Sequence, residues 1–548
     1  MPRHAAGVTL LLAALVAIPT FAAQRSGPAQ QGPATGTVSG RVTGPNGVPL
    51  RGAEVRLRDP NGRENRLATT DENGAFEVTN LPPGTWSVSA AKSGYITQHY
   101  QQRNPFSAPE TVTLAARQRV DVRFILRRGG AIAGRLVDEY GDPVAGARVQ
   151  VLRARYERGR RRLAQVGVSD QTDDTGAFRL YALPAGDYYL GATLRAAGAD
   201  GVVEIPVGVP TYYPGTTSIG DAQRLRLAAG EELAGVSFAL EPVRPTTVSG
   251  VVLSASGTPA TDASVMLLAA NDLSVIGAPL GNFGRAGAGG TFVIANVAPG
   301  TYRLQVRSGA VFDPMAGQGE EALMPLTVGP EGLSGITVTT ARTPPITGTV
   351  VTESGAALPP NLSVGVGLRQ PGGGADFIFT VRSSARAALP LRVPGLVGLV
   401  TFTIDPPRGW MVKQVELDGA DVTNRLFELR SATPTAKVTL TDRITRITGA
   451  VRRDGRPSPG AQVVFFPDDA DTWPYPSRYV TAVKADDRGT FAIDGVPPHQ
   501  DYLAVALDAL ETGDTEDPEF LASLREKGTR LSVDYGETAT LTLDLVAR

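Results

Sequence analysis

Short stretches of the chain alternate apolar and polar residues with a period of two. In residues 53–57, Ala53, Val55 and Leu57 share one face, while Glu54 and Arg56 occupy the other. The same alternation recurs at residues 147–151, 263–267 and 461–465. This period is typical of half-buried strands in antiparallel sheets, with one face on a core and the other in water. The pattern therefore predicts an all-β protein.

A short strand signature of the form V-x-G-x-V, with isoleucine or leucine in place of some of the valines, recurs along the chain. Its glycines follow one another about every hundred residues, at Gly40, Gly134, Gly250, Gly348 and Gly449. Self-similarity at a fixed period indicates repeated structural units. The repeat predicts five modules of about one hundred residues each.

A second signature predicts a hairpin within the modules. Thr70 to Phe76 reads T-D-x-x-G-x-F, and residues 172–178 repeat it, with a variant at 485–491. Aspartate caps such a turn, glycine takes the left-handed position, and phenylalanine enters the core. Eight residues after each phenylalanine comes a further turn, and an aromatic residue then starts a strand. These aromatic residues are Trp86, Tyr188, Tyr302 and Tyr502.

Taken in order, these motifs resemble the carboxypeptidase regulatory-like domain. The resemblance runs from about residue 36 to 548 and is weakest in the fourth module, which lacks the T-D-x-x-G-x-F motif. It implies a seven-stranded, transthyretin-like β-sandwich, related to starch-binding-like carbohydrate-binding domains, and it implies no peptidase activity. We therefore expect a tandem array of five Greek-key, transthyretin-like β-sandwich modules.

The amino terminus has the pattern of a secretory signal. Arg3 and His4 precede an apolar run at residues 8–18, and the small residues Ala22 and Ala23 follow. This run is too short to span a bilayer and fits a cleaved signal peptide. No later stretch reaches 18 uncharged apolar residues, so we expect no membrane span. The signal predicts export to the periplasm, the outer surface or the extracellular space.

The motifs and composition divide the chain into seven predicted segments. They are a signal peptide (1–23), a flexible leader (24–36), and β-sandwich modules at 37–128, 129–243, 244–343, 344–443 (divergent) and 444–548. The joins between modules are short and rich in proline, which predicts a semi-rigid string. One short helix is expected near the C-terminus, with Asp517 as its N-cap, Pro518 first and Gly528 as its stop.

Composition excludes several classes of function. The chain has 548 residues, 53 basic and 54 acidic ones, three histidines and no cysteine. Without cysteine there are no disulfides, thiolate metal sites or cysteine nucleophiles. The balanced charge gives no long-range field for nucleic acid. Because no histidine stands in a metal or triad motif, we expect a non-enzymatic protein with no cofactor and no catalytic or metal-binding residues.

Two charged clusters leave alternatives open. The first cluster holds Asp468, Asp469 and Asp471, with Asp486 and Asp487 as candidates to face them. It predicts either a weak calcium site or an ordinary polar surface. The second cluster holds six arginines between residues 153 and 162, and it predicts either a polyanion patch or a solvated hairpin loop. These arginines are Arg153, Arg155, Arg158, Arg160, Arg161 and Arg162.

The densest aromatic loop of the chain spans residues 473–479. Trp473, Tyr475 and Tyr479 offer flat rings that can stack on sugars, while Asp471 and Arg478 can bond hydroxyl groups. Prolines on both sides of Tyr475 prevent regular strand pairing. The loop therefore predicts a glycan-binding site. In the alternative, Trp473 folds back over the end of the sandwich and packs against the 517–527 helix.

These features favour a secreted, non-enzymatic scaffold or binding protein of the cell envelope or extracellular space. The alternative is a carbohydrate-binding protein that uses the aromatic residues of the fifth module. Candidate partners are a polysaccharide or another envelope protein. The sequence leaves the oligomeric state open.

Overall fold

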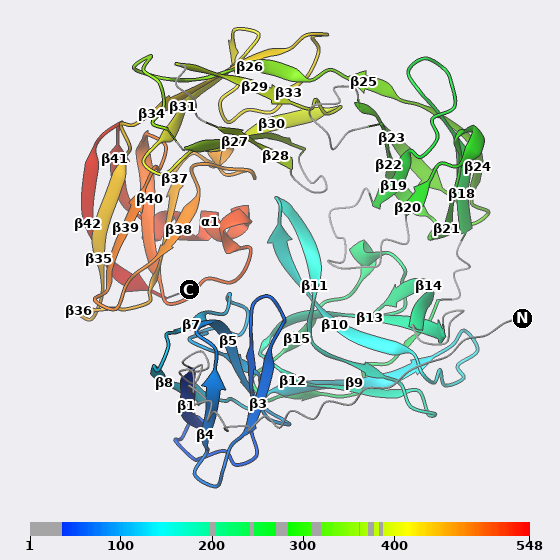
Figure 1. Cartoon of the computed structure of the whole chain (residues 1–548). Coiled ribbons are helices and arrows are strands. Elements are labelled where there is room, and N and C mark those ends of the chain that lie inside the picture. The colour runs from blue at the N-terminus through cyan, green and yellow to red at the C-terminus, as the bar shows by residue number, and fades with distance from the viewer. Residues whose placement is uncertain are drawn as a thin grey trace, which may run out of the picture.

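The structure is a computed structural model that describes residues 35–197, 204–241, 246–269, 283–309, 319–360, 362–370, 377–382 and 387–547. Its strands form five β-sandwich modules, which follow one another around a ring (Figure 1). The predicted all-β fold is confirmed. The predicted signal peptide and almost all of the leader lie outside the described residues.

The first module shows the topology that the second and third repeat. Its strands are β1 Gly36–Thr43, β2 Glu54–Arg58, β3 Asn65–Thr69, β4 Ala75–Leu81, β5 Gly84–Ala91, β6 Gln98–His99, β7 Thr111–Leu114 and β8 Arg119–Ile125. One sheet has the order β4-β1-β8, and the other has the order β3-β2-β5-β6 with β7 also on β5. β1 pairs antiparallel with β4 and parallel with β8, so the first and last strands of the module are neighbours.

The second and third modules keep this arrangement. The second comprises β9 Gly130–Val137, β10 Arg148–Glu157, β11 Arg160–Gln171, β12 Ala177–Leu183, β13 Gly186–Ala197, β14 Glu204–Tyr212, the 3-10 turn η1 Ile219–Asp221, β15 Leu225–Leu227, β16 Glu232–Leu233 and β17 Phe238–Ala239. The third comprises β18 Thr246–Leu253, β19 Ser264–Ala269, β20 Phe283–Arg285, η2 Ala288–Gly290, β21 Thr291–Val297, β22 Gly300–Ser308, β23 Gly319–Val328, β24 Leu333–Thr339 and β25 Ala341–Thr343. In each, the first strand again pairs parallel with late strands of the same module.

The fourth and fifth modules complete the ring. The fourth comprises β26 Ile346–Thr352, β27 Ser363–Arg369, β28 Phe377–Arg382, β29 Ala388–Val393, β30 Leu399–Asp405, β31 Met411–Leu417, β32 Ala420–Asp421, β33 Phe427–Glu428 and β34 Thr435–Thr441. The fifth comprises β35 Arg446–Arg453, β36 Arg456–Pro457, β37 Gln462–Pro467, η3 Ala470–Thr472, β38 Thr481–Lys484, β39 Thr490–Asp494, β40 His499–Leu507, η4 Asp514–Glu516, α1 Pro518–Leu524, η5 Arg525–Lys527, β41 Thr529–Val533 and β42 Thr538–Val546. The expected helix near the C-terminus is therefore present as α1, and Asp517 caps it by accepting from Glu519 N at 2.9 Å.

The repeated glycine of the strand signature has a steric explanation. A Cβ atom on Gly40 would lie 1.9 Å from the carbonyl oxygen of Val122 on the neighbouring parallel strand. Equivalent Cβ atoms on the other four glycines would lie 1.7–2.3 Å from a carbonyl oxygen of the late segment of their own module that runs beside the first strand. Such distances are far below any real contact, so a side chain here would push the first and last strands apart. The signature thus marks the place where each module closes.

The predicted hairpins and turns are also present. Asp71 accepts hydrogen bonds from Asn73 N and Ala75 N, each at 2.8 Å, and Gly74 takes a left-handed φ of 70°. The aromatic residue after the next turn closes back over that turn. In the fifth module, for example, Tyr502 donates its hydroxyl hydrogen bond to Pro497 O at 2.8 Å. Its burial raises the pKa of this phenol. Local sequence therefore specifies the corner of the sandwich.

Each module has its own apolar core between its two layers. The fifth module adds a second cluster, in which Leu521 and Leu524 of α1 pack on the outer face of its sheet. No helix in the described part of the chain is long and apolar enough to cross a bilayer.

Candidate functional site

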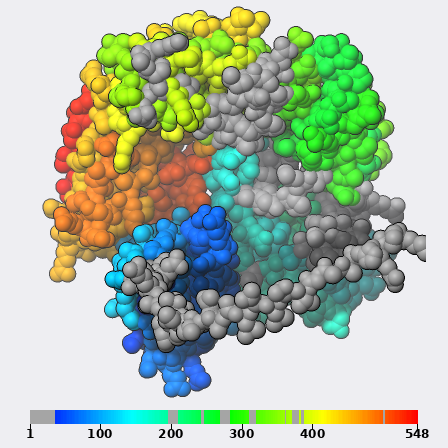
Figure 2. All heavy atoms as spheres, viewed as in Figure 1, coloured from blue at the N-terminus to red at the C-terminus, as the bar shows by residue number. Residues whose placement is uncertain are grey.

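The arginine-rich segment forms a hairpin that projects into the middle of the ring. Residues 148–152 of β10 pair with β13, whereas residues 153–157 pair only with β11 and extend beyond the sandwich. Figure 2 shows the cyan surface of this hairpin between the red fifth module and the blue first module. The hairpin therefore reaches from the second module across the ring.

At the base of the hairpin, Arg153 joins three modules. Its Nη2 atom lies 2.5 Å from Oε2 of Glu511 in the fifth module. Its guanidinium also lies 3.8 Å from the centre of the Phe106 ring of the first module. At the hairpin tip, Gly159 N donates to Oε2 of Glu516 at 2.8 Å. Arg153 therefore belongs to a contact between modules. It fits neither predicted alternative, the polyanion patch or the solvated hairpin loop.

The fifth module also contacts the first module directly. Arg103 Nη1 lies 2.9 Å from Oδ1 of Asp508, and Lys484 forms an ion pair with Glu110. Thr512 N donates to the carbonyl oxygen of Phe106 at 3.1 Å. The two ends of the array are thus in contact, and the predicted semi-rigid string is wrong: the modules form a closed ring. We call this set of contacts the closure interface.

Neighbouring modules around the ring are joined by buried polar groups as well. Glu321 of the third module is 1% exposed. It accepts from Gln305 Nε2 at 2.7 Å, from Arg307 Nε at 3.0 Å and from Val397 N of the fourth module at 2.9 Å. Since the carboxylate is fully hydrogen-bonded, it fixes the position of the fourth module against the third.

The residues predicted to bind glycan lie where the fourth and fifth modules meet. Arg478 is half-buried and donates to Val412 O at 2.9 Å and to Asn424 Oδ1 at 3.2 Å, both in the fourth module. Burial lowers the pKa of this guanidinium. Tyr479 accepts from Asn424 Nδ2 at 3.0 Å. Tyr475 lies beneath Arg369 of the fourth module, 5.1 Å from its guanidinium.

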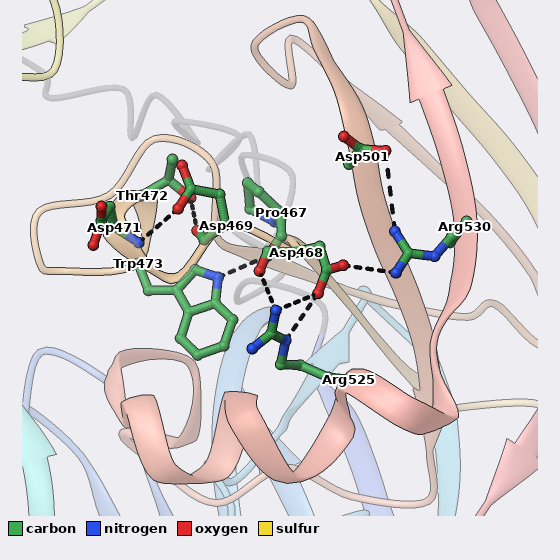
Figure 3. A network of polar contacts seen from close by, with 9 residues as sticks. All are labelled: Pro467, Asp468, Asp469, Asp471, Thr472, Trp473, Asp501, Arg525 and Arg530. Atoms are coloured by element: carbon green, nitrogen blue, oxygen red, sulfur yellow. Dashed lines mark hydrogen bonds and ion pairs between the residues drawn. The ribbon is translucent and has the colours of Figure 1, made fainter.

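Trp473 does not belong to an open platform. Its side chain is 5% exposed and packs edge-on against Phe466 at 5.7 Å. Its Nε1 donates to Pro467 O at 2.7 Å (Figure 3). The same cluster contains Leu521 and Leu524 of α1, so the alternative prediction, packing against the helix, is confirmed. Glycan binding by this loop stays a prediction. The Trp473 ring is too buried to stack on a sugar.

One member of the acidic cluster beside Trp473, Asp468, is neutralised by arginines. Asp468 accepts from Arg525 Nε at 2.8 Å and from Arg530 Nη2 at 2.6 Å (Figure 3). These two hydrogen bonds hold the pKa of the Asp468 carboxyl below its ordinary value. Asp469 caps a 3-10 turn by accepting from Asp471 N at 3.1 Å. Within the described ranges no group of three or more potential ligands is placed to hold a metal ion.

The sequence did not predict the closure interface. The charged residues of the interface belong to no recurring motif, and those of the first module lie almost 400 residues before those of the fifth. They are Arg103, Glu110, Lys484, Asp508 and Glu511. The nearest signal in the sequence is the arginine cluster, whose first member, Arg153, meets Glu511. A charged surface residue that does not recur from module to module gives no information about which distant surface it contacts.

Comparison with known proteins identifies one module by family. Residues 37–127 match the family described as the carboxypeptidase regulatory-like domain, which confirms the resemblance for the first module. No curated protein matches the chain.

Solved structures that the chain matches include two pilins, at low identity and low TM-score. The Streptococcal ancillary pilin is 12% identical, covers 56% of this chain and 99% of its own, and has a TM-score of 0.23. GBS52, the minor pilin of Streptococcus agalactiae, is 17% identical, covers 38% and 97%, and has a TM-score of 0.19. The Bacillus anthracis TIE protein is 15% identical with a TM-score of 0.16, and the match covers 56% of this chain. The present chain spans about half, 51%, of the TIE protein.

Proposed function

We propose that the protein is an exported, non-enzymatic scaffold or binding protein of the cell envelope or extracellular space, in which five β-sandwich modules act as one closed ring. The observation that carries the proposal is that the fifth module contacts the first, second and fourth modules together. A ring presents its surfaces at fixed relative positions, whereas independent modules on linkers would not.

The chemistry of the chain supports a binding role. Its three histidines lie outside any ligand or triad motif, and it has no cysteine. Its recurring internal motifs serve turns, strand closure and corner hydrogen bonds. Export rests on the amino-terminal signal, and sequencing of the secreted protein should find the mature chain starting just after Ala22 or Ala23.

Small-angle X-ray scattering of the mature protein tests the ring. A compact chain of this length has a radius of gyration of about 24 Å. Five modules placed end to end, each roughly 26 Å long at about 3.3 Å per strand residue, would form a rod with a radius of gyration near 40 Å. We expect a value below about 30 Å, because the modules surround a filled centre.

A pair of charge reversals should open the ring. Arg103→Glu with Lys484→Glu places like charges against Asp508 and Glu110, so the radius of gyration should rise toward that of the rod. Arg123→Glu is the matched control, because Arg123 is exposed on β8 and its ion pair, with Asp121 at 3.7 Å, is made within the first module. A wild-type value near 40 Å would contradict the proposal.

The carbohydrate-binding alternative keeps only part of its support. The fold resemblance favours it, but Trp473 is packed inside the fifth module and Arg478 is committed to the fourth. A glycan array probed with the secreted protein decides it. Specific glycan retention that is lost in Tyr475→Ala would favour this alternative over a purely structural role.

A further inference from the structure

The closure interface encloses a cleft between the first and fifth modules. The cleft has a volume of about 870 Å³, which lies within the range of roughly 300–1,000 Å³ that is usual for ligand sites. Gln101, Glu110 and Arg127 line it from the first module, and Lys484, Asp487 and Asp508 line it from the fifth. Both modules are needed to form it, so this closure cleft exists only in the closed ring.

The two walls of the closure cleft carry opposite charges that are not neutralised internally. Arg127 is exposed on one wall and Asp487 on the other. Neither side chain has a hydrogen bond or ion pair with any residue that the structure describes. By contrast, the adjacent Asp486 is used by its own turn, where it accepts from Arg488 N and Thr490 N. Arg127 and Asp487 therefore remain available to a ligand with both signs of charge.

The remaining lining favours a peptide over a sugar. Ile125, 52% exposed, and Ile96 give the cleft an apolar surface. None of the described residues that line the cleft is aromatic. Flat rings are the usual stacking surface for sugars, whereas exposed isoleucines suit an aliphatic side chain.

One wall also ends in a strand whose edge is open: β38 is the outermost strand of its sheet in the fifth module. On the opposite wall β6 is an edge strand too, but the backbone N–H and C=O of His99 are bonded to Gln102. Gln98 of β6 and Lys484 of β38 line the cleft. An edge strand has unpaired backbone groups, and an extended peptide is the ligand that such groups bind.

We propose that the closure cleft binds an extended peptide segment of a partner protein, with a basic residue at Asp487, an acidic residue at Arg127 and an aliphatic side chain on Ile96 and Ile125. This inference rests on the proposed closed ring, because the same residues form the closure contacts and line the cleft. They are Arg103, Glu110 and Lys484. By linkage, a peptide that contacts both modules stabilises the closed ring.

The test is selection of a random peptide library, displayed on phage, against the immobilised mature protein. A selected peptide is then synthesised, and its affinity is measured by fluorescence anisotropy. We expect enriched peptides to combine an acidic, an aliphatic and a basic residue. Arg127→Glu or Asp487→Lys should each weaken binding by about tenfold, since each replaces an attraction with a repulsion. Arg123→Glu, four residues before Arg127 and outside the cleft, should leave the affinity unchanged.

A charge swap makes the test specific. A peptide with its acidic and basic residues exchanged should bind the Arg127→Glu/Asp487→Lys double variant better than it binds the wild type. The proposal is overturned if no peptide is enriched, if the double variant binds the original peptide unchanged, or if these two substitutions instead abolish retention of a glycan. Scattering separates the two failures: a closed ring without peptide binding contradicts only this inference, whereas an open array contradicts the proposed function itself.

Discussion

Replacing Trp473 with alanine tests the packing of the fifth module against the glycan-binding prediction. The indole is 5% exposed, lies among Phe466, Leu521 and Leu524, and donates to Pro467 O. Removing about 200 Å² of buried aromatic surface at about 25 cal/mol per Å² costs about 5 kcal/mol. Buried Trp-to-Ala changes in other proteins cost about 3–5 kcal/mol, so we expect a loss in that range.

The assay is urea unfolding of a fragment covering residues 444–548, which we expect to fold alone because the fifth module has its own core. Trp473 is the single tryptophan in this fragment, so unfolding must be followed by circular dichroism in order to compare the variant with the wild type. Trp473→Phe is the matched control. It keeps a ring against Phe466 but loses the hydrogen bond to Pro467, and it should cost about 1–2 kcal/mol.

A different set of results would refute this reasoning. If Trp473→Ala changes the free energy of unfolding by less than about 1 kcal/mol, the indole is not packed as described. If the same variant keeps its stability but loses retention on a glycan, Trp473 belongs to an exposed sugar platform. A fragment without a cooperative transition would instead contradict the independence of the module.

Three further predictions concern single sites. Phe491→Ala in the 444–548 fragment should lower the free energy of unfolding by about 3–5 kcal/mol, because this ring is buried against the core; urea titration measures it. The pKa of Asp468 is lower in the folded protein than its ordinary value of about 3.9. The stability from its two arginine contacts is therefore present above about pH 4, and it is lost as the pH falls through the folded pKa. Asp468→Asn should therefore flatten the acid side of a melting-temperature profile, and an unchanged slope would contradict the role of these contacts. Glu321→Ala leaves buried donors without their acceptor and should cost about 3–5 kcal/mol, seen as faster amide exchange at Val397, whereas Glu321→Gln should cost less.

Much of each module can be predicted from the sequence because its determinants are local. The T-D-x-x-G-x-F hairpin depends on Asp71 accepting from amides two and four residues ahead. The aromatic corner depends on Trp86 donating to Pro82 O, four residues before it. Such contacts recur wherever the same short motif occurs, so reading the motif in the sequence is sufficient.

The candidate site could be predicted only in part. The concentration of aromatic and proline residues identified residues 473–479 as the candidate binding loop, but it did not show which of the rings are buried. That depended on the position of α1, whose Leu521 and Leu524 close over Trp473. The same sequence pattern is compatible with an exposed ring and a buried one, and only the packed structure distinguishes them.

The sequence alone determined the repeat, the strands, the turns and the glycines at which each module closes, because these depend on residues close together in the chain or repeated in register. The tertiary structure decided that the modules form a ring, that Arg153 reaches Glu511, and that a cleft lies between Arg127 and Asp487. These contacts depend on the orientations of four successive joins between modules. Small rotations at each join add up along the array, so they decide whether its two ends meet, and no local pattern of residues encodes their sum.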